Sequence, residues 1–151
     1  MGASGQVMEI AVRGNVQTPV RVENLGDVLN VARGFFKAEF VRAVEIPAAL
    51  VAPGTTCFAL PARFVKELKL HRRGTRKART ASGFAFFGVY EPVRLCVQDR
   101  ECFIEVVKVP DGCPPLLGRL PLQLLDLCVD EANGRLVGNP EHDGHPMVDL
   151  F

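Results

Sequence analysis

The sequence predicts a mainly β fold, and two observations carry this prediction. Apolar and polar residues alternate over short stretches, which is the pattern of half-buried strands. The 14 Gly and 11 Pro residues fall irregularly between these stretches, as expected for turns that join short strands. At 151 residues the chain is long enough to bury a core without disulfides or a metal, so we expect one domain over residues 1–151.

The expected strands occur throughout the chain. Residues 84–90 and 103–109 are rich in β-branched and aromatic side chains, which favour strands. Asn133-Gly134 predicts a hairpin turn between Val129 and Leu136, because both residues tolerate positive φ. Residues 147–151 alternate and predict a terminal strand that a lone subunit would leave as an open edge. Further strands are expected over residues 7–12, 20–23 and 41–51.

Two short helices are expected. The first begins near Pro61, since proline suits the first helical position, and its residues Phe64, Val65 and Leu68 share one face. The second begins near Pro121 and is rich in leucine.

Composition excludes several classes of protein. Hydrophobic residues at 48% and charged residues at 23% are typical of a globular chain. No apolar run approaches the ~20 residues of a membrane helix, and no signal peptide is visible, so we expect no membrane partner. The five scattered cysteines fit free thiols in a reducing compartment, which predicts a cytoplasmic protein. Without a phosphate-binding or dinucleotide-binding glycine motif, we expect no cofactor.

A basic run covers residues 66–79, although the net charge is only +1. Such a run could meet phosphates, which leaves a nucleic-acid-associated module as one hypothesis. No aromatic residue interrupts the run to stack on bases, so we expect a solvated helix end and loop instead. The basic residues are Lys66, Lys69, His71, Arg72, Arg73, Arg76, Lys77 and Arg79.

A cluster of polar side chains spans residues 141–145 and contains a His-x-x-His pair at His142 and His145. A zinc site normally takes further ligands from elsewhere at a recognisable spacing. None is evident in the sequence, so we expect a turn and no metal.

Residues 48–61 carry the most informative motif. An apolar run ends at Val51, a small turn follows, and the apolar pattern resumes at Cys57. This segment resembles the active-site loop of bacterial, single-domain retropepsin-like aspartic peptidases, where a hydrophobic strand leads into an Asp-Thr-Gly turn. The sequence departs from that pattern at Ala52, in place of Asp, and at Pro53, in place of Thr. The other loop positions are similar to the family: Gly54, Thr55 and Thr56.

The resemblance runs from about residue 22 to residue 151 and is weak over residues 1–20 and 35–40. Residues 79–83 and 89–95 resemble the flap hairpin and the strand that follows it, with Ser82, Gly83 and Phe84 at the flap. Leu116, Leu117 and Gly118 resemble the element that crosses beneath the active-site loop.

The resemblance implies a retropepsin-like closed β barrel with a flap hairpin and one or two short helices. It also implies a homodimer, since each chain supplies one loop to a site on the two-fold axis. An extended peptide would bind beneath the flap like an added strand.

The chemistry of the family is missing from this sequence. Aspartic peptidases activate water between two carboxylates, one protonated and one ionised. Ala52 can neither accept nor donate a proton, and Pro53 lacks the threonine hydroxyl and an N–H group. We therefore expect a catalytically inactive homologue that retains at most peptide binding. The alternative is an active dimeric aspartic endopeptidase in which mutagenesis put Ala52 in place of the aspartate, but the second departure at Pro53 favours natural loss.

No other residue is expected to replace the aspartate. The remaining aspartates of interest occur in turn-like contexts, where they usually bond the backbone. Glu45 is expected on a solvent-facing strand position, and Cys57 has no histidine near it in sequence that would activate the thiol. These turn aspartates are Asp99, Asp111, Asp130 and Asp143.

Overall fold

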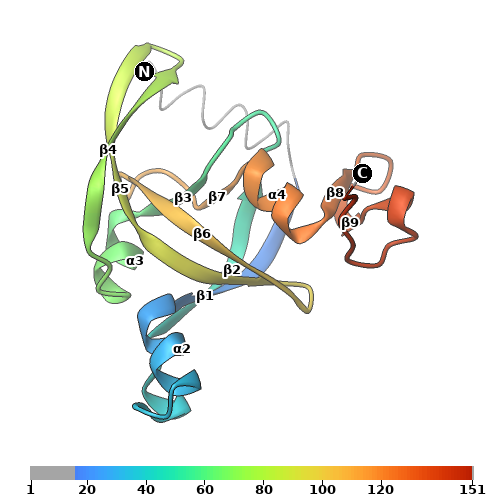
Figure 1. Cartoon of the computed structure of the whole chain (residues 1–151). Helices are drawn as coiled ribbons and strands as arrows, with labels where there is room; N and C mark the ends of the chain where they lie inside the picture. Colours follow the sequence, from blue (N-terminus) through green and yellow to red (C-terminus); the bar gives the residue numbers. More distant parts are fainter. Residues whose placement is uncertain (1–15, 151) are drawn as a thin grey trace.

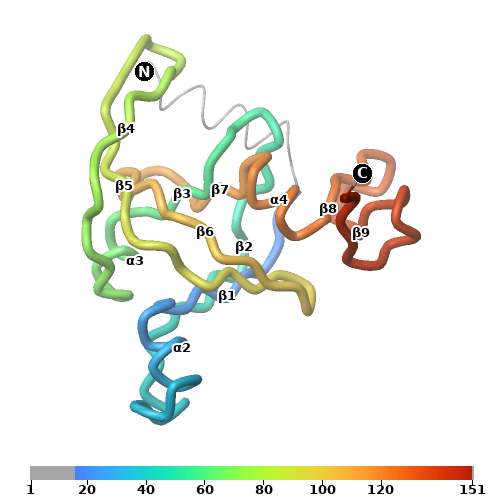
Figure 2. Tube along the Cα trace, viewed as in Figure 1, coloured from blue at the N-terminus to red at the C-terminus, as the bar shows by residue number. Residues whose placement is uncertain are grey.

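The computed structural model describes residues 16–150 and is mainly β. Six strands form a closed barrel, in which each strand pairs with the next and β1 pairs with β5 to complete the ring (Figures 1 and 2). In order around the ring these are β1 (Gln17–Asn24), β2 (Ala43–Val51), β7 (Leu116–Leu117), β3 (Phe58–Pro61), β6 (Arg100–Val109) and β5 (Gly83–Val97).

One strand of the seven-stranded sheet lies outside the ring, and β8 (Leu127–Asp130) and β9 (Arg135–Gly138) form a separate two-stranded sheet. β4 (Arg72–Thr80) pairs only with β5, and together they form a long hairpin that rises from the barrel (Figure 1). The 15 residues of β5 therefore belong to both the hairpin and the barrel. Its second half closes the barrel against β1 through residues 93–96, and its first half pairs with β4.

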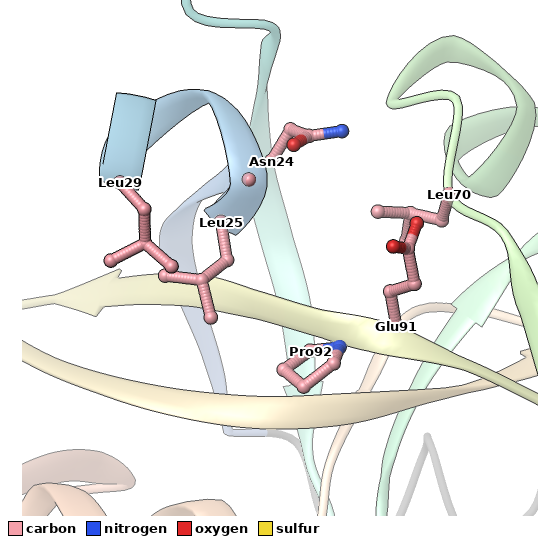
Figure 3. A pocket seen from close by; sticks show the side chains of 7 residues that line it. Asn24, Leu25, Leu29, Leu70, Glu91 and Pro92 are labelled. Atoms are coloured by element: carbon pink, nitrogen blue, oxygen red, sulfur yellow. The ribbon is translucent and has the colours of Figure 1, made fainter. Parts of the chain in front are cut away.

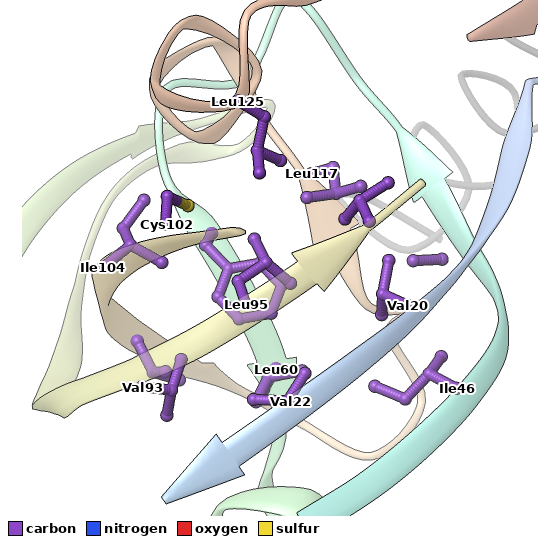
Figure 4. Close-up of a cluster of buried hydrophobic side chains, with 14 of the residues drawn as sticks. Val20, Val22, Ile46, Leu60, Val93, Leu95, Cys102, Ile104, Leu117 and Leu125 are labelled. Carbon is purple, nitrogen blue, oxygen red and sulfur yellow. The ribbon is translucent and has the colours of Figure 1, made fainter. Parts of the chain in front are cut away.

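The barrel interior is filled by alternating apolar side chains. Val22 of β1 and Val93 and Leu95 of β5 are fully buried (Figure 4). Their neighbours in sequence are more exposed. This alternation follows from the pleat of a strand, which places every second side chain on the same face. The burial pattern agrees with the strands expected from the sequence.

Apart from the terminal strand, the predicted strands and the hairpin within residues 16–150 are confirmed. Residues 20–23 and 41–51 correspond to β1 and β2, and residues 84–90 and 103–109 lie in β5 and β6. Asn133-Gly134 lies in the turn between β8 (Leu127–Asp130) and β9 (Arg135–Gly138), although only Gly134 has positive φ, at 63°. The strand expected over residues 7–12 lies outside the described residues.

Both predicted helices are present, as α3 (Ala62–Glu67) and α4 (Arg119–Leu125). The helix count of one or two is nevertheless wrong, because α2 (Leu25–Ala32) is a third. Two short 3-10 helices also occur, at Ala38–Phe40 and Pro140–His142. None of the helices within residues 16–150 has the length and apolar character that a membrane span requires.

The predicted terminal strand is wrong over residues 147–150, which form no strand; Phe151 lies outside the described residues. The physical reason is a set of bonds that fixes this segment as irregular chain. The Met147 N–H donates to Asp126 Oδ2 at 3.2 Å, and His142 Nε2 lies 3.1 Å from Asp149 Oδ2.

Polar bonds, more than apolar packing, hold α2 to the barrel. The Asn24 side chain accepts a hydrogen bond from the Asp27 N–H at 3.0 Å and donates to the Leu68 carbonyl at 2.9 Å. Asp27 is buried, and the Arg42 guanidinium donates to both of its carboxylate oxygens at 2.7 and 2.8 Å. These bonds from Arg42 hold the pKa of Asp27 below its ordinary value.

We predict that Asn24→Ala lowers the free energy of unfolding by about 2 kcal/mol, because it removes a helix cap and leaves the buried Leu68 carbonyl unpaired. Denaturant unfolding measures this loss. Asn30→Ala is the matched control, since Asn30 lies on an exposed position of the same helix. Equal stability of the two variants would contradict the role assigned to Asn24.

Candidate functional site

The bend between β2 and β3, residues 52–57, is a tight turn held from below. The Thr55 N–H donates to the Ala52 carbonyl at 2.9 Å, which makes Pro53 and Gly54 the central turn residues. Proline suits the first of these positions, because its fixed φ matches and its missing N–H is not used. The Ala52 N–H donates to the Leu117 carbonyl at 2.8 Å.

The segment of Leu116, Leu117 and Gly118 crosses beneath this bend. Leu117 lies between the two strands that flank the bend, parallel to Val51 of β2 and antiparallel to Phe58 of β3. Leu117 is fully buried, and Leu116 is half-buried. The sequence-predicted residues of the bend and of the crossing segment are therefore brought together.

The start of α4 is bonded to the bend. The backbone N–H groups of Gly118, Arg119 and Leu120 donate to the carbonyls of Cys57, Thr55 and Thr56, at 2.9, 2.7 and 2.9 Å respectively. The first N–H groups of a helix have no partner within the helix, so these bonds satisfy them and the carbonyls of the bend together. The fit requires glycine, because a Cβ at residue 118 would lie 2.6 Å from the Thr55 carbonyl oxygen and still closer to that of Cys57.

A cavity of about 690 Å³ lies between the bend and the β4–β5 hairpin. Residues 54–57 line one side, residues 76–81 line the other, and Phe87 and Val107 complete the wall. Three of the lining residues are cations, Arg76, Lys77 and Arg79. Among the described residues, no Asp, Glu or His lines this cavity.

The remaining sequence-predicted residues take different places. Ala52 is only 4% exposed and does not line the cavity, so its methyl group faces packed protein within the described chain. Pro53 is exposed. Ser82, Gly83 and Phe84 lie at the turn of the hairpin and just beyond it, outside the cavity wall that ends at Ala81.

Cys57 lines the cavity but is a poor nucleophile. Burial raises the pKa of its thiol, and the positive charge of Arg76 offsets this only in part. The reactive form of cysteine is the thiolate, which is therefore scarce at neutral pH. With no histidine in the cavity wall to take the proton, the site lacks the partner that cysteine catalysis needs.

The turn aspartates and Glu45 are engaged elsewhere. Asp111 accepts from the Arg63 N–H at the start of α3, and Asp130 accepts from the Asn133 side chain at 2.7 Å. Glu45 bonds Arg21 on the neighbouring strand, at 2.5 Å. Asp99 and Asp143 occupy left-handed turn positions, with φ of 63° and 54°.

A second hollow of about 190 Å³ lies between α2 and the start of the barrel segment of β5 (Figure 3). Leu25, Leu29, Leu70 and Pro92 supply an apolar wall. The carboxylate of Glu91 bonds the His71 backbone N–H at 2.7 Å and its ring at 2.9 Å. The polar groups of this hollow are therefore already paired, and its size suits a packing gap.

His142 of the polar cluster at residues 141–145 links the end of α4 to the C-terminal segment. His142 Nδ1 lies 2.7 Å from Asp126, and its Nε2 lies 3.1 Å from Asp149. Bonding to Asp126, then to Asp149, raises the pKa of His142, while His142 lowers the pKa of Asp126. Within residues 16–150, no three His, Cys, Asp or Glu side chains are placed to hold a metal ion.

Strand pairing also reveals residues that the sequence analysis missed. Lys77 and Arg79 of β4 lie directly opposite Phe86 and Phe84 of β5. The basic run contains no aromatic residue, which argued against nucleic acid, yet the hairpin supplies aromatic rings from the next strand. The small turn residues 80–83, directly before the β-prone residues 84–90, are the signal that could have revealed this pairing.

We predict that Gly118→Ala lowers the free energy of unfolding by about 2–3 kcal/mol, because the new methyl group meets backbone carbonyls that cannot move independently. Gly112→Ala is the control, since no atom lies within 4 Å of a Cβ built there. Thermal unfolding of both variants measures the difference. A Gly118→Ala protein as stable as the control would show that the bend tolerates displacement.

We also predict that the C-terminal segment loosens as pH rises through the raised pKa of His142. Because the folded pKa of His142 is raised, its stabilising charge is fully present below about 6.5 and is lost as pH rises through the raised pKa. The Asp126 contribution has the opposite sense and is lost as pH falls below about 3.8.

Amide hydrogen exchange at Met147, corrected for intrinsic rate, should therefore accelerate as pH rises through the raised pKa of His142. His142→Gln removes the titrating group and is expected to abolish this pH dependence. An unchanged dependence in His142→Gln would contradict the assignment.

Comparison with known proteins does not place the chain in a family. No family model and no curated protein matches the sequence. The resemblance to retropepsin-like peptidases therefore stays a prediction from the sequence motifs of the bend, the crossing segment and the hairpin.

Proposed function

We propose that the chain is a retropepsin-like domain that binds an extended peptide and does not cleave it. The observation that carries the proposal is the cavity between residues 54–57 and the β4–β5 hairpin, with the crossing segment 116–118 beneath the bend. A loop, a hairpin above it and a hydrophobic-hydrophobic-Gly element below it are the parts that the family resemblance requires.

Peptide binding is supported by the backbone of β4. This strand pairs with β5 on one side only, so its other edge has N–H and C=O groups without a strand partner in the described chain. Residues 76–80 of this strand line the cavity. An extended peptide that enters the cavity can bond such an edge in the way an added strand does.

Loss of catalysis is supported by the composition of the cavity. Hydrolysis by this family's mechanism requires a carboxylate to take a proton from water. The lining residues include no carboxylate, and Ala52 presents a methyl group where the resemblance expects aspartate. Cys57 does not substitute, since burial keeps its thiol protonated.

A homodimer is part of the proposal. One chain supplies one bend, and the family builds its cleft from two bends on a two-fold axis. Pro53 and Gly54 are exposed in the single chain, which leaves the tip of the bend free to meet a second copy.

The test of inactivity compares Ala52→Asp, Pro53→Thr and the double variant in cleavage of a library of extended peptides. We expect no cleavage by the present sequence or by Ala52→Asp alone, because natural loss has altered both positions. Mass spectrometry of the library detects products, and sedimentation velocity establishes whether each variant is a dimer.

Cleavage by Ala52→Asp alone would overturn natural loss and favour an active endopeptidase whose aspartate was replaced. Peptide binding is tested separately by capture from the same library. Ala78→Trp, which fills the cavity wall, should abolish capture, whereas Ala132→Trp in the exposed β8–β9 turn should not. Equal capture by both variants would exclude the cavity as the peptide site.

A further inference from the structure

One face of the β4–β5 hairpin, here called the outer face, displays aromatic rings beside cations. Phe84 and Phe86 are 64% and 72% exposed, and both lie on the same face of β5 because they are two residues apart. Lys77 Nζ lies 4.5 Å from the centre of the Phe84 ring, and the Arg79 guanidinium lies 5.8 Å from it. Phe87, which points the other way, lines the cavity.

This outer face continues along β5 to Tyr90. The pairing with β4 is regular in β5 between residues 83 and 90, so Phe84, Phe86, Gly88 and Tyr90 share one side. Lys108 Nζ lies 5.4 Å from the centre of the Tyr90 ring. A Cβ at Gly88 would meet the Tyr90 ring at 3.0 Å and the Arg72 guanidinium at 3.5 Å, which places both groups over this glycine.

A basic hollow extends the same face toward α3. Its volume is about 550 Å³, and Tyr90 and Lys108 form part of its wall. Lys66, Lys69 and His71 line the rest of its polar surface. The outer face therefore joins rings and cations from the hairpin turn to the end of α3.

Little negative charge offsets these cations. Residues 72–90 contain five Lys or Arg and no Asp or Glu. Glu105 approaches Arg73 at 3.7 Å, and Glu91 is bonded to His71. Within residues 16–150, no carboxylate forms an ion pair with Arg76, Lys77 or Arg79.

We propose that this outer face binds single-stranded nucleic acid, with Phe84, Phe86 and Tyr90 as stacking surfaces and the neighbouring cations as phosphate contacts. Exposed rings that alternate with cations along one sheet face match what proteins use to hold unpaired bases and their backbone. The two proposed sites share Lys77 and Arg79, which also line the cavity, whereas Phe84, Phe86 and Tyr90 do not line it. The aromatic variants therefore test this proposal separately from peptide binding.

Two other partners fit the face less well. A membrane surface would require apolar side chains at the hairpin tip, but the tip is formed by Thr80, Ala81, Ser82 and Gly83. An acidic peptide would account for the cations and would leave the exposed rings without a planar partner. The favoured ligand is therefore one that carries both phosphates and bases.

The experiment measures fluorescence anisotropy of labelled oligo-dT and oligo-U over a range of salt concentrations. We expect log affinity to fall linearly with log salt, with a slope of about −0.7 for each phosphate neutralised. Lys77→Gln/Arg79→Gln should flatten that slope by about 0.7 for each cation removed. Arg33→Gln/Lys37→Gln is the matched control, since these exposed residues lie near α2, at the opposite end of the molecule from the hairpin tip (Figure 1).

Stacking is tested by Phe84→Ala/Phe86→Ala, which should weaken binding by about tenfold or more at fixed salt. Phe103→Ala is its control, because Phe103 is a 55% exposed ring on β6 opposite Arg94, in the barrel segment of the sheet. All of these side chains are exposed, so thermal unfolding should be unchanged, and this is checked for every variant.

Three results would overturn the proposal. The first is no binding of either oligonucleotide at low salt. The second is binding that the charge variant weakens, but for which Phe84→Ala/Phe86→Ala and the control Phe103→Ala have the same affinity. Such a result would mean electrostatic attraction without stacking. The third is retention on vesicles containing phosphatidylserine, lost in Phe84→Ala/Phe86→Ala, without oligonucleotide binding.

Discussion

Three backbone hydrogen bonds between residues 55–57 and residues 118–120 hold the centre of this molecule together. They satisfy the carbonyls of the bend and the free N–H groups of α4 at the same time, although the two segments are about sixty residues apart in sequence. The close approach is possible only because residue 118 has no side chain. These three hydrogen bonds fix the position of the bend and the direction of α4. The shape of the cavity depends on them as well.

The strands could be predicted from sequence because their signal is local. Alternation in residues 20–23 and 93–97 predicts which side chains face inward. Val22, Val93 and Leu95 are buried, as this pattern predicts. α2 could not be predicted in the same way. This helix is eight residues long, contains Gly26 and buries only Asp27. Its stability comes from hydrogen bonds with Arg42 and Leu68, which are distant in sequence and leave no local pattern.

The candidate site was predictable only in part for the same reason. The residues of the bend and the crossing segment were identified from their motifs, and the structure brings them together. The cavity could not be predicted from the sequence. Its wall combines Thr55 with Arg76 and Ala81, which lie close together only because the hairpin extends over the barrel. Alternation in the terminal segment predicts a strand, whereas Asp126 and His142 hold this segment by polar bonds to Met147 and Asp149.

The edge position of β4 has a consequence for the behaviour of the protein at high concentration. A strand with one free side is a template on which another copy's strand can add, the first step toward fibrils. Five of the nine residues of β4 are Lys or Arg, so two such edges that approach each other bring like charges together. The strand therefore opposes self-assembly while it stays open to ligands of negative charge.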